Sequence, residues 1–461
     1  MRTPRPQRFP RLGALALLTA ALALALTAAA PRDDDRPAKP AAPPAKERVE
    51  EVNKLIAANF DHLEALYKHL HSHPELSLQE VRTAARLAKE LREIGFDVTE
   101  KVGGTGVVGV LKNGKGPTLL IRTDMDALPV IERTGLPYAS SVRVRDRNDR
   151  EVGVMHACGH DMHMTCWVGT ARVLAGMKDR WQGTLVFIGQ PAEEIGAGAR
   201  HMLAAGLFKK FPRPDYCLAL HCDGNRPHGS IAYTEGLALA NVDSVDITVR
   251  GKGGHGAAPH TTIDPIVIAA RIVLDLQTLV SRETNPTDPA VITVGSIHGG
   301  SKHNVIPNEV KLQLTVRSTK DAVRKHLLDG IKRVADAAAM AAGAPPPVVK
   351  VDPEEFTPAL LNDPALTRKT VALFKEVLGP DKVLERPAVM GGEDFGRYGR
   401  EGVPIFLYFL GTIAPERVAE AARTGRPLPS LHSDLYYPVP EPSIRTGVRT
   451  MSLAALNLLG K

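Results

Sequence analysis

The chain has 461 residues, of which 43% are apolar and 24% are charged, and its formal net charge is +7. Single hydrophobic cores stop growing at roughly 250–300 residues, so two domains are expected. The composition is that of a globular protein and excludes bulk disorder. Removing the four arginines of residues 1–30 lowers the net charge from +7 to +3, so the basic balance gives no reason to expect a nucleic-acid partner.

Residues 1–30 are typical of an export signal. A basic start is followed by an apolar run at residues 12–30, which ends in alanines. This order predicts a signal peptide and an exported protein, periplasmic or secreted. The apolar run also reaches the lower range of membrane spans, so an uncleaved anchor, and membrane contact through it, stays open. Residues 31–46 are rich in Pro, Ala and charge, which predicts a linker.

Residues 47–238 and 353–461 are predicted to form one catalytic domain. Apolar residues at three- and four-residue steps across residues 49–70 predict an amphipathic helix. Ser77 and Glu80 have the spacing of a capping box ahead of a second helix. Short apolar strands with helical stretches between several of them then predict an α/β sheet with buried strands. These strands are expected at residues 106–111, 118–123, 184–189, 215–220 and 404–411.

Residues 239–352 have the pattern of a separate, inserted domain. Strands and two long helices follow one another in the order β-α-β-β-α-β, which is typical of a ferredoxin-like α+β sandwich. The strands are expected at residues 244–250, 290–297, 309–318 and 348–352, and the helices at about 264–280 and 320–342. An exposed edge of this sheet could pair across a two-fold axis, so a homodimer through this domain is an open expectation.

Polar side chains follow three of the apolar strands at the point where each strand ends. Asp124 and Asp126 follow one strand, Glu193 and Glu194 follow another, and His221 follows a third. In open α/β sheets, ligands bind beyond the carboxyl ends of the strands. The sequence therefore predicts one shared crevice that holds these side chains.

The segment HACGHDMHM, residues 156–164, is the densest group of metal-binding residue types in the chain. Cys158 and His160 are two positions apart, so both would face one point if the segment is extended. A thiolate and an imidazole suit zinc or another late divalent metal. Alone the pair is a weak signal, but the residues at the strand ends and His432 strengthen it. Of two adjacent glutamates, one can bind metal while the other acts as a base.

Eight motifs occur in order across residues 50–455, namely HSHPELS, RTDMDALPV, HACGHDMHM, QPAEEIGAGA, LHCD, GKGGHGAAPHTTIDP, HNVIPNEV and LHSDLYYP. This set resembles the metal-dependent amidohydrolases that include hippurate hydrolase, N-acyl-amino-acid amidohydrolases and auxin-conjugate hydrolases, within the wider aminoacylase and carboxypeptidase metallopeptidase family. The resemblance implies a three-layer α/β/α catalytic domain with a mixed sheet and an inserted ferredoxin-like lid. It also implies cleavage of the amide bond of N-acyl amino acids or small peptides, which releases a carboxylic acid and an amino acid.

The resemblance further implies a site with two divalent metal ions. Glu193 falls on the acid/base position, from which it would activate a metal-bound water and later protonate the leaving amine. His255 falls on the position of the lid histidine, which would donate to the oxyanion. Asp126 is expected to orient a ligand histidine. The family's ligand positions are occupied by Cys158, His160, Glu194, His221 and His432.

Asn304 and Arg317 lie in the inserted domain, where both could hold a substrate carboxylate. A turn asparagine and a surface arginine at a strand end fit the same positions equally well. Zinc is the metal favoured by the affinity order, although manganese, cobalt and nickel fit the same donors.

Two other interpretations stay open. Cys158 could act as a nucleophile with a histidine partner, and such an enzyme would stay active after metal removal. An exported, non-catalytic binding protein for acyl-amino acids or peptides could use the same scaffold. The presence of Glu193 beside all five candidate ligands argues against this second alternative.

Overall fold

The computed structural model describes residues 45–460. The predicted signal peptide and nearly all of the predicted linker lie outside these residues. No helix within residues 45–460 is long and apolar enough to cross a lipid bilayer. The four cysteines are buried and are free thiols.

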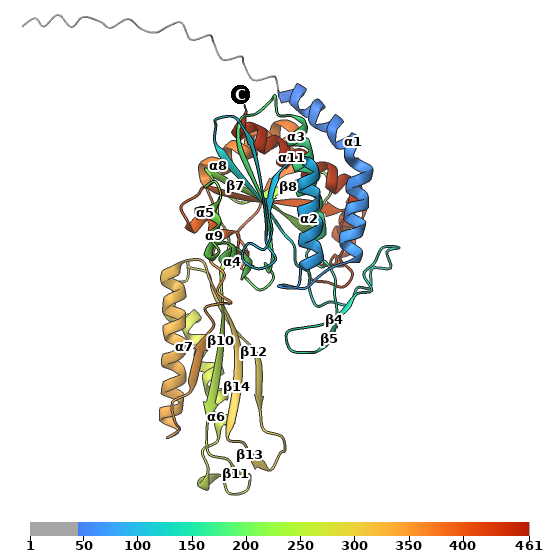
Figure 1. Cartoon of the computed structure of the whole chain (residues 1–461). Coiled ribbons are helices and arrows are strands. Elements are labelled where there is room, and N and C mark those ends of the chain that lie inside the picture. The colour runs from blue at the N-terminus through green and yellow to red at the C-terminus, as the bar shows by residue number, and fades with distance from the viewer. Residues whose placement is uncertain (1–44, 461) are drawn as a thin grey trace, which may run out of the picture. The chain divides into compact units, whose positions relative to one another are not determined.

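An eight-stranded mixed sheet forms the centre of the catalytic domain. Figure 1 shows this sheet with helices around it. Its four central strands are parallel, and an antiparallel strand flanks them on each side. The predicted mixed α/β sheet is therefore confirmed. In sheet order the strands are β1 (Asp97–Thr99), β2 (Val107–Asn113), β6 (Gly183–Gln190), β3 (Thr118–Asp124), β7 (Tyr216–Pro227), β18 (Ile405–Ile413), β8 (Ile231–Tyr233) and β17 (Val383–Glu385).

Alternate side chains of one strand enter two different hydrophobic cores. In β18, Phe406 and Tyr408 face one core, and Leu407 and Phe409 face the other. Because side chains alternate across a strand, an apolar residue at every position requires cover on both faces. The first core is covered by α1 (Ala45–Ser72), α2 (Val81–Ile94), α3 (His160–Gly176), α8 (Pro364–Leu378) and α11 (Pro440–Leu459), and the second by α4 (Gly198–Ala204), α5 (Leu207–Lys210) and α9 (Gly396–Arg400). These layers confirm the three-layer α/β/α architecture.

A second sheet, of four antiparallel strands, forms the small domain, residues 241–351. Its strand order is β12-β14-β10-β15, and two helices cover one face and share a separate core with it (Figure 1). This arrangement confirms the ferredoxin-like inserted domain. In chain order the elements are β10 (Asn241–Arg250), α6 (Pro265–Thr278), β12 (Ala290–Gly299), β14 (Glu309–Ser318), α7 (Asp321–Ala341) and β15 (Val348–Val351).

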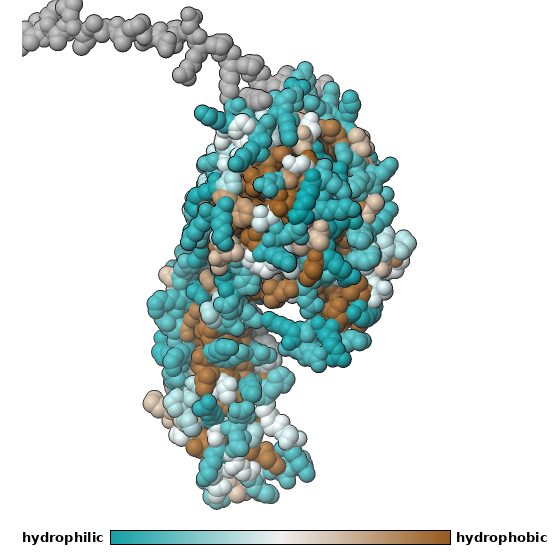
Figure 2. Space-filling view, in the orientation of Figure 1, coloured by the Kyte–Doolittle hydropathy of each residue, from teal (hydrophilic) through white to brown (hydrophobic). Residues whose placement is uncertain are grey.

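Short strand pairs lie outside the two sheets. They are β4 (Arg143–Arg145) with β5 (Glu151–Gly153), β9 (Gly236–Leu239) with β16 (Leu360–Asn362), and β11 (Gly254–His255) with β13 (Val305–Ile306). The other elements are α10 (Pro415–Thr424) and the short helical turns at Pro259–Thr261, Leu279–Glu283 and Pro380–Lys382. The face of the molecule in Figure 2 is mainly hydrophilic, with hydrophobic residues in separate patches. This surface agrees with burial of the apolar side chains in the cores.

The capping box predicted at Ser77 and Glu80 is wrong. Helix α2 begins at Val81 without a side-chain cap. Ser77 Oγ instead donates to the Asp126 carboxylate at 2.6 Å, and Glu80 Oε1 accepts from the backbone N–H of Ala192 at 2.8 Å. Both side chains thus hold the loops that carry the site residues, because tertiary contacts outweigh the local capping preference here.

Candidate metal centre

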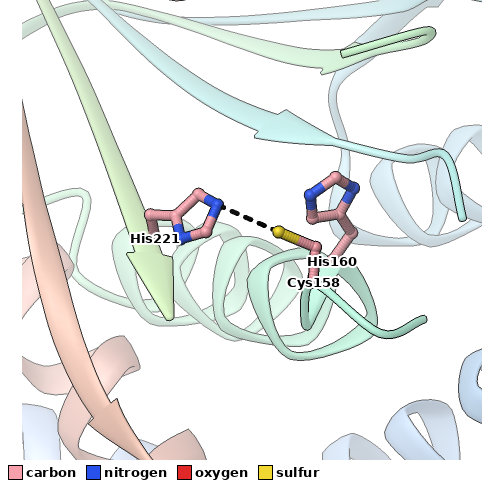
Figure 3. A group of neighbouring side chains, drawn as sticks. All are labelled: Cys158, His160 and His221. Atoms are coloured by element: carbon pink, nitrogen blue, oxygen red, sulfur yellow. Dashed lines mark hydrogen bonds between the residues drawn. The ribbon is translucent and has the colours of Figure 1, made fainter. Parts of the chain in front are cut away.

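Two groups of metal-binding atoms that share Cys158 meet near the carboxyl ends of the parallel strands, and His221, which was predicted to follow its strand, lies within β7. Cys158, His160 and His221 form one group, and Cys158, Glu194 and His432 form the other. Within each group the donor atoms lie within 4.8 Å of one another. Cys158 Sγ and His221 Nε2 are 3.5 Å apart and point toward each other in Figure 3, with His160 beside them. Cys158 belongs to both groups, so one sulfur joins two adjacent sets of donors.

The hydrogen bonds of two histidines leave one ring nitrogen of each free to bind a metal. His160 Nδ1 lies 2.7 Å from the backbone oxygen of Asp126, and His221 Nδ1 lies 2.8 Å from that of Cys222. A carbonyl oxygen only accepts, so each Nδ1 donates, and in the neutral ring each Nε2 keeps its lone pair. Among the described residues, the buried His160 Nε2 and Glu194 Oε1 have no hydrogen-bond partner. Buried polar atoms of this kind require a partner, and a cation would supply it.

The electrostatics of the site also fit cations. Burial lowers the pKa of His160, but Asp124, Asp126 and Glu194 outweigh this effect and raise the pKa to about 10. Burial, together with Asp126, raises the pKa of Glu194 to about 8, although His160 opposes this. Burial and the nearby glutamates raise the pKa of the Cys158 thiol. Divalent cations would offset the repulsion among these groups and stabilise their deprotonated forms. The donor set therefore fits two such ions.

Unusual backbone conformations position two of the candidate ligands. Gly159, with φ +82°, turns the chain between Cys158 and His160, so the extended segment predicted here is wrong. A Cβ on Gly159 would lie 2.9 Å from Cys222 Sγ, so only glycine fits. His432 has φ 69°, a conformation that costs a non-glycine residue about 1–3 kcal/mol and that is often found at functional sites.

The two adjacent glutamates differ in their neighbours. Glu194 Oε2 lies 3.5 Å from His432 Nε2, whereas the Glu193 carboxylate also forms a close group with Glu393 and Asp394. Glu193 Oε2 lies 3.9 Å from His160 Nε2, and its side chain is 9% exposed. Burial and Glu393 raise the pKa of Glu193. Glu193 is therefore a nearly buried carboxylate beside the donor groups, in a position to exchange protons with a reactant in the cleft.

Asp126 holds this arrangement together. Its carboxylate accepts hydrogen bonds from the backbone N–H groups of Glu193 and Glu194 at 3.1 and 3.0 Å, and from Ser77 Oγ at 2.6 Å. Its backbone oxygen accepts from His160 Nδ1. Asp126 thus contacts a histidine, as expected from the sequence: its backbone oxygen accepts from His160 Nδ1, and its Oδ1 lies 3.6 Å from the same nitrogen, while its carboxylate fixes the turn that carries both glutamates.

A buried arginine beneath the glutamates was not predicted. Arg122, on β3, is 2% exposed and contacts Asp124 at 2.7 Å, Glu393 at 2.8 Å and Asp394 at 3.2 Å. Glu393 also lines the cleft. A buried charge requires such partners, and together they form a rigid floor below the site. The signal in the sequence was the single charge inside the apolar strand TLLIRT.

A cleft of about 330 Å³ lies over the candidate ligands, and the small domain contributes part of its lining, including Arg317. His255 and Asn304 do not line this cleft. Both are exposed on the β11–β13 segment, where Gly256 N–H donates to the Asn304 backbone oxygen at 2.8 Å. This segment follows the far end of β10, and the eight residue steps from Val242 to Arg250 span about 26 Å. Within one chain, Arg317 therefore reaches the cleft, whereas His255 and Asn304 do not.

Comparison with known proteins places the chain among metallopeptidases. The model of peptidase family M20/M25/M40 matches residues 120–423. Thermostable carboxypeptidase 1 of Saccharolobus solfataricus is 36% identical over 79% of this chain and 89% of its own length. N-acetylcysteine deacetylase of Bacillus subtilis is 36% identical over 75% of this chain and 87% of its own length. The crystal structure of a dinuclear metal-binding M20 peptidase from Bacillus subtilis has a TM-score of 0.69 and 30% identity, and covers 87% of this chain and 99% of that one.

The chain belongs to peptidase family M20/M25/M40. This membership confirms the predicted class, a metal-dependent hydrolase that cleaves amide bonds, and the resemblance on which it was based. A site for two metal ions agrees with the dinuclear relative. The non-catalytic alternative is not favoured, because the relatives are named as enzymes.

Proposed function

We propose that this hydrolase cleaves N-acyl amino acids or short peptides that carry a free α-carboxylate, releasing a carboxylic acid and an amino acid. The observation that carries the proposal is one sulfur, Cys158 Sγ, shared by two donor groups beside a nearly buried carboxylate, Glu193. The relatives named as a carboxypeptidase and an N-acetylcysteine deacetylase support it, since both names describe cleavage of an amide next to a carboxylate.

The proposed cofactor is a pair of zinc ions. Zinc is favoured because thiolate and imidazole donors suit it and because it stands high in the affinity order, although manganese, cobalt and nickel fit the same donors. Bound at the site, the metal pair would polarise the scissile carbonyl and acidify a water molecule. The residues proposed to hold it are Cys158, His160, Glu194, His221 and His432.

Glu193 would act as the general base and then as the general acid. Its carboxylate would take the proton of the attacking water and deliver it to the leaving nitrogen. Arg317 would bind the substrate carboxylate. It donates to Thr315 Oγ1 at 3.1 Å and to the Met390 backbone oxygen at 3.2 Å. Both acceptors are neutral, so several of its five N–H donors remain for a carboxylate.

His255 is proposed to donate a hydrogen bond to the oxyanion in the cleft of a second copy, with Asn304 beside it. Strand β10 places His255 too far from the cleft of its own chain, which supports an action in the cleft of a second copy. The edges of the small-domain sheet offer a surface for a two-fold dimer. Mixing inactive His255→Ala and Glu193→Gln proteins under conditions of subunit exchange should regain activity, because one mixed cleft has both residues. No regain in mixed dimers would show that His255 acts in its own chain.

The N-terminal segment is proposed to be a cleaved export signal, which would make the mature protein periplasmic or secreted. The basic start and the apolar run of residues 12–30 support this. Mass spectrometry of the mature N-terminus from fractionated cells tests it. Recovery of the intact N-terminus in the membrane fraction would support an anchor instead.

Metal analysis followed by a hydrolysis screen tests the proposed function. The purified protein is expected to hold about two equivalents of divalent metal. Chelation should abolish the hydrolysis of N-acyl amino acids and dipeptides, and each metal, added back separately, should show which one restores it best. Full activity after complete metal removal would contradict the proposal and favour a thiol enzyme.

A further inference from the structure

A hairpin outside the main sheet reaches the rim of the metal cleft. It consists of β4 and β5, and Arg147 lies in the turn between them. Arg147 lines the cleft together with Glu193, Glu194 and His432. The roles proposed above for the site residues do not use this arginine.

Glu355 holds Arg147 at this position. An Arg147 Nη2–Glu355 Oε1 contact of 3.3 Å joins the hairpin to the segment that follows β15. The contact is long for a charge-assisted hydrogen bond, and a guanidinium has five N–H donors, so most of the donors of Arg147 are free. The Arg147 side chain is 69% exposed. Arg147 is therefore held by an anion but still available to a second one.

Two guanidinium groups line the cleft, and one carboxylate, that of Glu355, contacts one of them. Within the described residues, Arg317 contacts no carboxylate, and its pKa is lowered by burial alone. Glu393, which also lines the cleft, is already paired with Arg122. Two guanidinium groups thus face the space where a substrate would lie, and one α-carboxylate would occupy only one of them.

The sheet register gives the order of the two arginines. Arg317 pairs with Val242, and Thr315 pairs with Ser244, which is two residues, or about 7 Å, further along β10. Ser244 and Arg147 line both the metal cleft and a second groove, of about 410 Å³, that continues over the open face of the small-domain sheet. Arg147 therefore lies beyond Arg317, at the junction of the cleft and the groove. An amino-acid side chain would extend toward Arg147 when its α-carboxylate contacts Arg317.

We propose that Arg147 is a specificity-determining residue that binds a second carboxylate of the substrate, so that the enzyme prefers N-acyl derivatives of glutamate or aspartate. The proposal rests on the amidohydrolase function proposed above and names its substrate class. Glu355 positions the guanidinium, and the incoming carboxylate takes the donors that Glu355 leaves free.

The test compares two substrates that differ in the charge of one side chain. N-acetyl-L-glutamate and N-acetyl-L-glutamine have nearly the same shape, and the wild-type kcat/KM is expected to be at least about tenfold higher for the glutamate compound. Arg147→Gln should remove most of this preference and leave kcat/KM for the glutamine compound within about twofold. Arg145→Gln is the matched control, because Arg145 lies in the same hairpin, pairs with Asp149 and does not line the cleft. It should keep the preference.

Product inhibition gives a second measurement. L-Glutamate should inhibit the wild-type enzyme more strongly than L-glutamine does, and Arg147→Gln should remove the difference. Equal kcat/KM for the two substrates in the wild type, or an equal loss for both in Arg147→Gln, would overturn the proposal. If the metal-loaded wild type cleaves neither these nor other N-acyl amino acids, the underlying amidohydrolase function fails instead.

Discussion

The two sides of the metal cleft are built in different ways. On the side of the catalytic domain, the Asp126 carboxylate accepts three hydrogen bonds and the buried Arg122 contacts three carboxylates. Across the cleft, Arg317 of the small domain bonds only neutral acceptors, and at the rim the exposed Arg147, on the β4–β5 hairpin of the catalytic domain, has one long contact. Metal binding and proton transfer require atoms that are held within a fraction of an ångström, whereas substrate selection tolerates side chains that adjust. The comparison therefore assigns metal binding and proton transfer to the first side of the cleft and substrate selection to the second.

The largest loss of activity is expected from Glu193→Gln. Loss of a general base typically lowers kcat by about 10²- to 10⁴-fold, and the bound metal should stay unchanged. Steady-state kinetics and elemental analysis of the same sample measure both quantities. Glu194→Gln is the matched control, because it should lose metal as well as activity. Loss of metal from Glu193→Gln would show that Glu193 is itself a ligand.

Asp126→Asn should have the next largest effect, a loss of about 10- to 100-fold in metal affinity or kcat/KM. The amide would present N–H donors to a position that now accepts hydrogen bonds from Ser77 and from two backbone N–H groups. Metal titration and kinetics measure the loss. Ser77→Ala removes only one of these bonds and should therefore cost less. Wild-type metal affinity and kcat/KM in Asp126→Asn would mean that the turn holds Glu193 and Glu194 in place without the Asp126 carboxylate.

Arg317→Met tests the selecting side of the cleft. It should raise KM for N-acyl amino acids by about tenfold or more and change kcat little, since the lost contact binds the ground state and the transition state alike. Arg317→Lys keeps the charge and should recover part of the affinity. A fall in kcat at constant KM would instead show that Arg317 stabilises the transition state. The two sides of the cleft would then no longer differ in function.

The smallest effect is expected on the stability of the fold, from substitution of His71, a residue outside the candidate ligand set. His71 is buried between Asp161 at 2.6 Å and Glu132 at 3.0 Å. Burial lowers the pKa of His71, but the two carboxylates outweigh this effect and raise the pKa to about 9. The pKa of an unfolded histidine is about 6.5, so the stabilisation by this ion pair is complete below pH 6.5 and is lost as the pH rises through 9.

His71→Gln should therefore be less stable than the wild type by an amount on the order of 1–3 kcal/mol near pH 6, and this difference should shrink toward pH 9. Thermal unfolding of both proteins across this range measures it. A difference that does not vary with pH would show that His71 is neutral in the folded protein.

Local patterns in the sequence predicted the fold and part of the site. The long buried strands of the catalytic domain contain apolar runs such as TLVFIG and IFLYFLG, so these strands could be predicted without tertiary information. The carboxyl ends of parallel strands meet at one edge of a sheet, so Glu194 and His221 were expected to lie together. His432 is on none of these strand ends, and its place among the candidate ligands came from the resemblance to a family.

The features that were missed depend on contacts between distant segments. Arg122 and Glu393 are 271 positions apart, and no local pattern connects them. Ser77 and Glu80 match a capping box, but Ser77 bonds to Asp126, and Glu80 accepts from Ala192 of a distant loop as well as from the nearby Leu78. Arg147 lies in RVRDRNDRE, which looks like a solvated charged turn until the packing against Glu355 is known.

The sulfur of Cys158 makes the two halves of the centre vulnerable to the same damage. It is the only thiol among the five candidate donors, and peroxides convert thiolates in steps to sulfenic and sulfinic acids. Damage to His221 or His432 would affect one donor group, whereas oxidation of this single atom would weaken both. Exposure to oxidants should therefore inactivate the enzyme in one step, without a half-loaded form that accumulates.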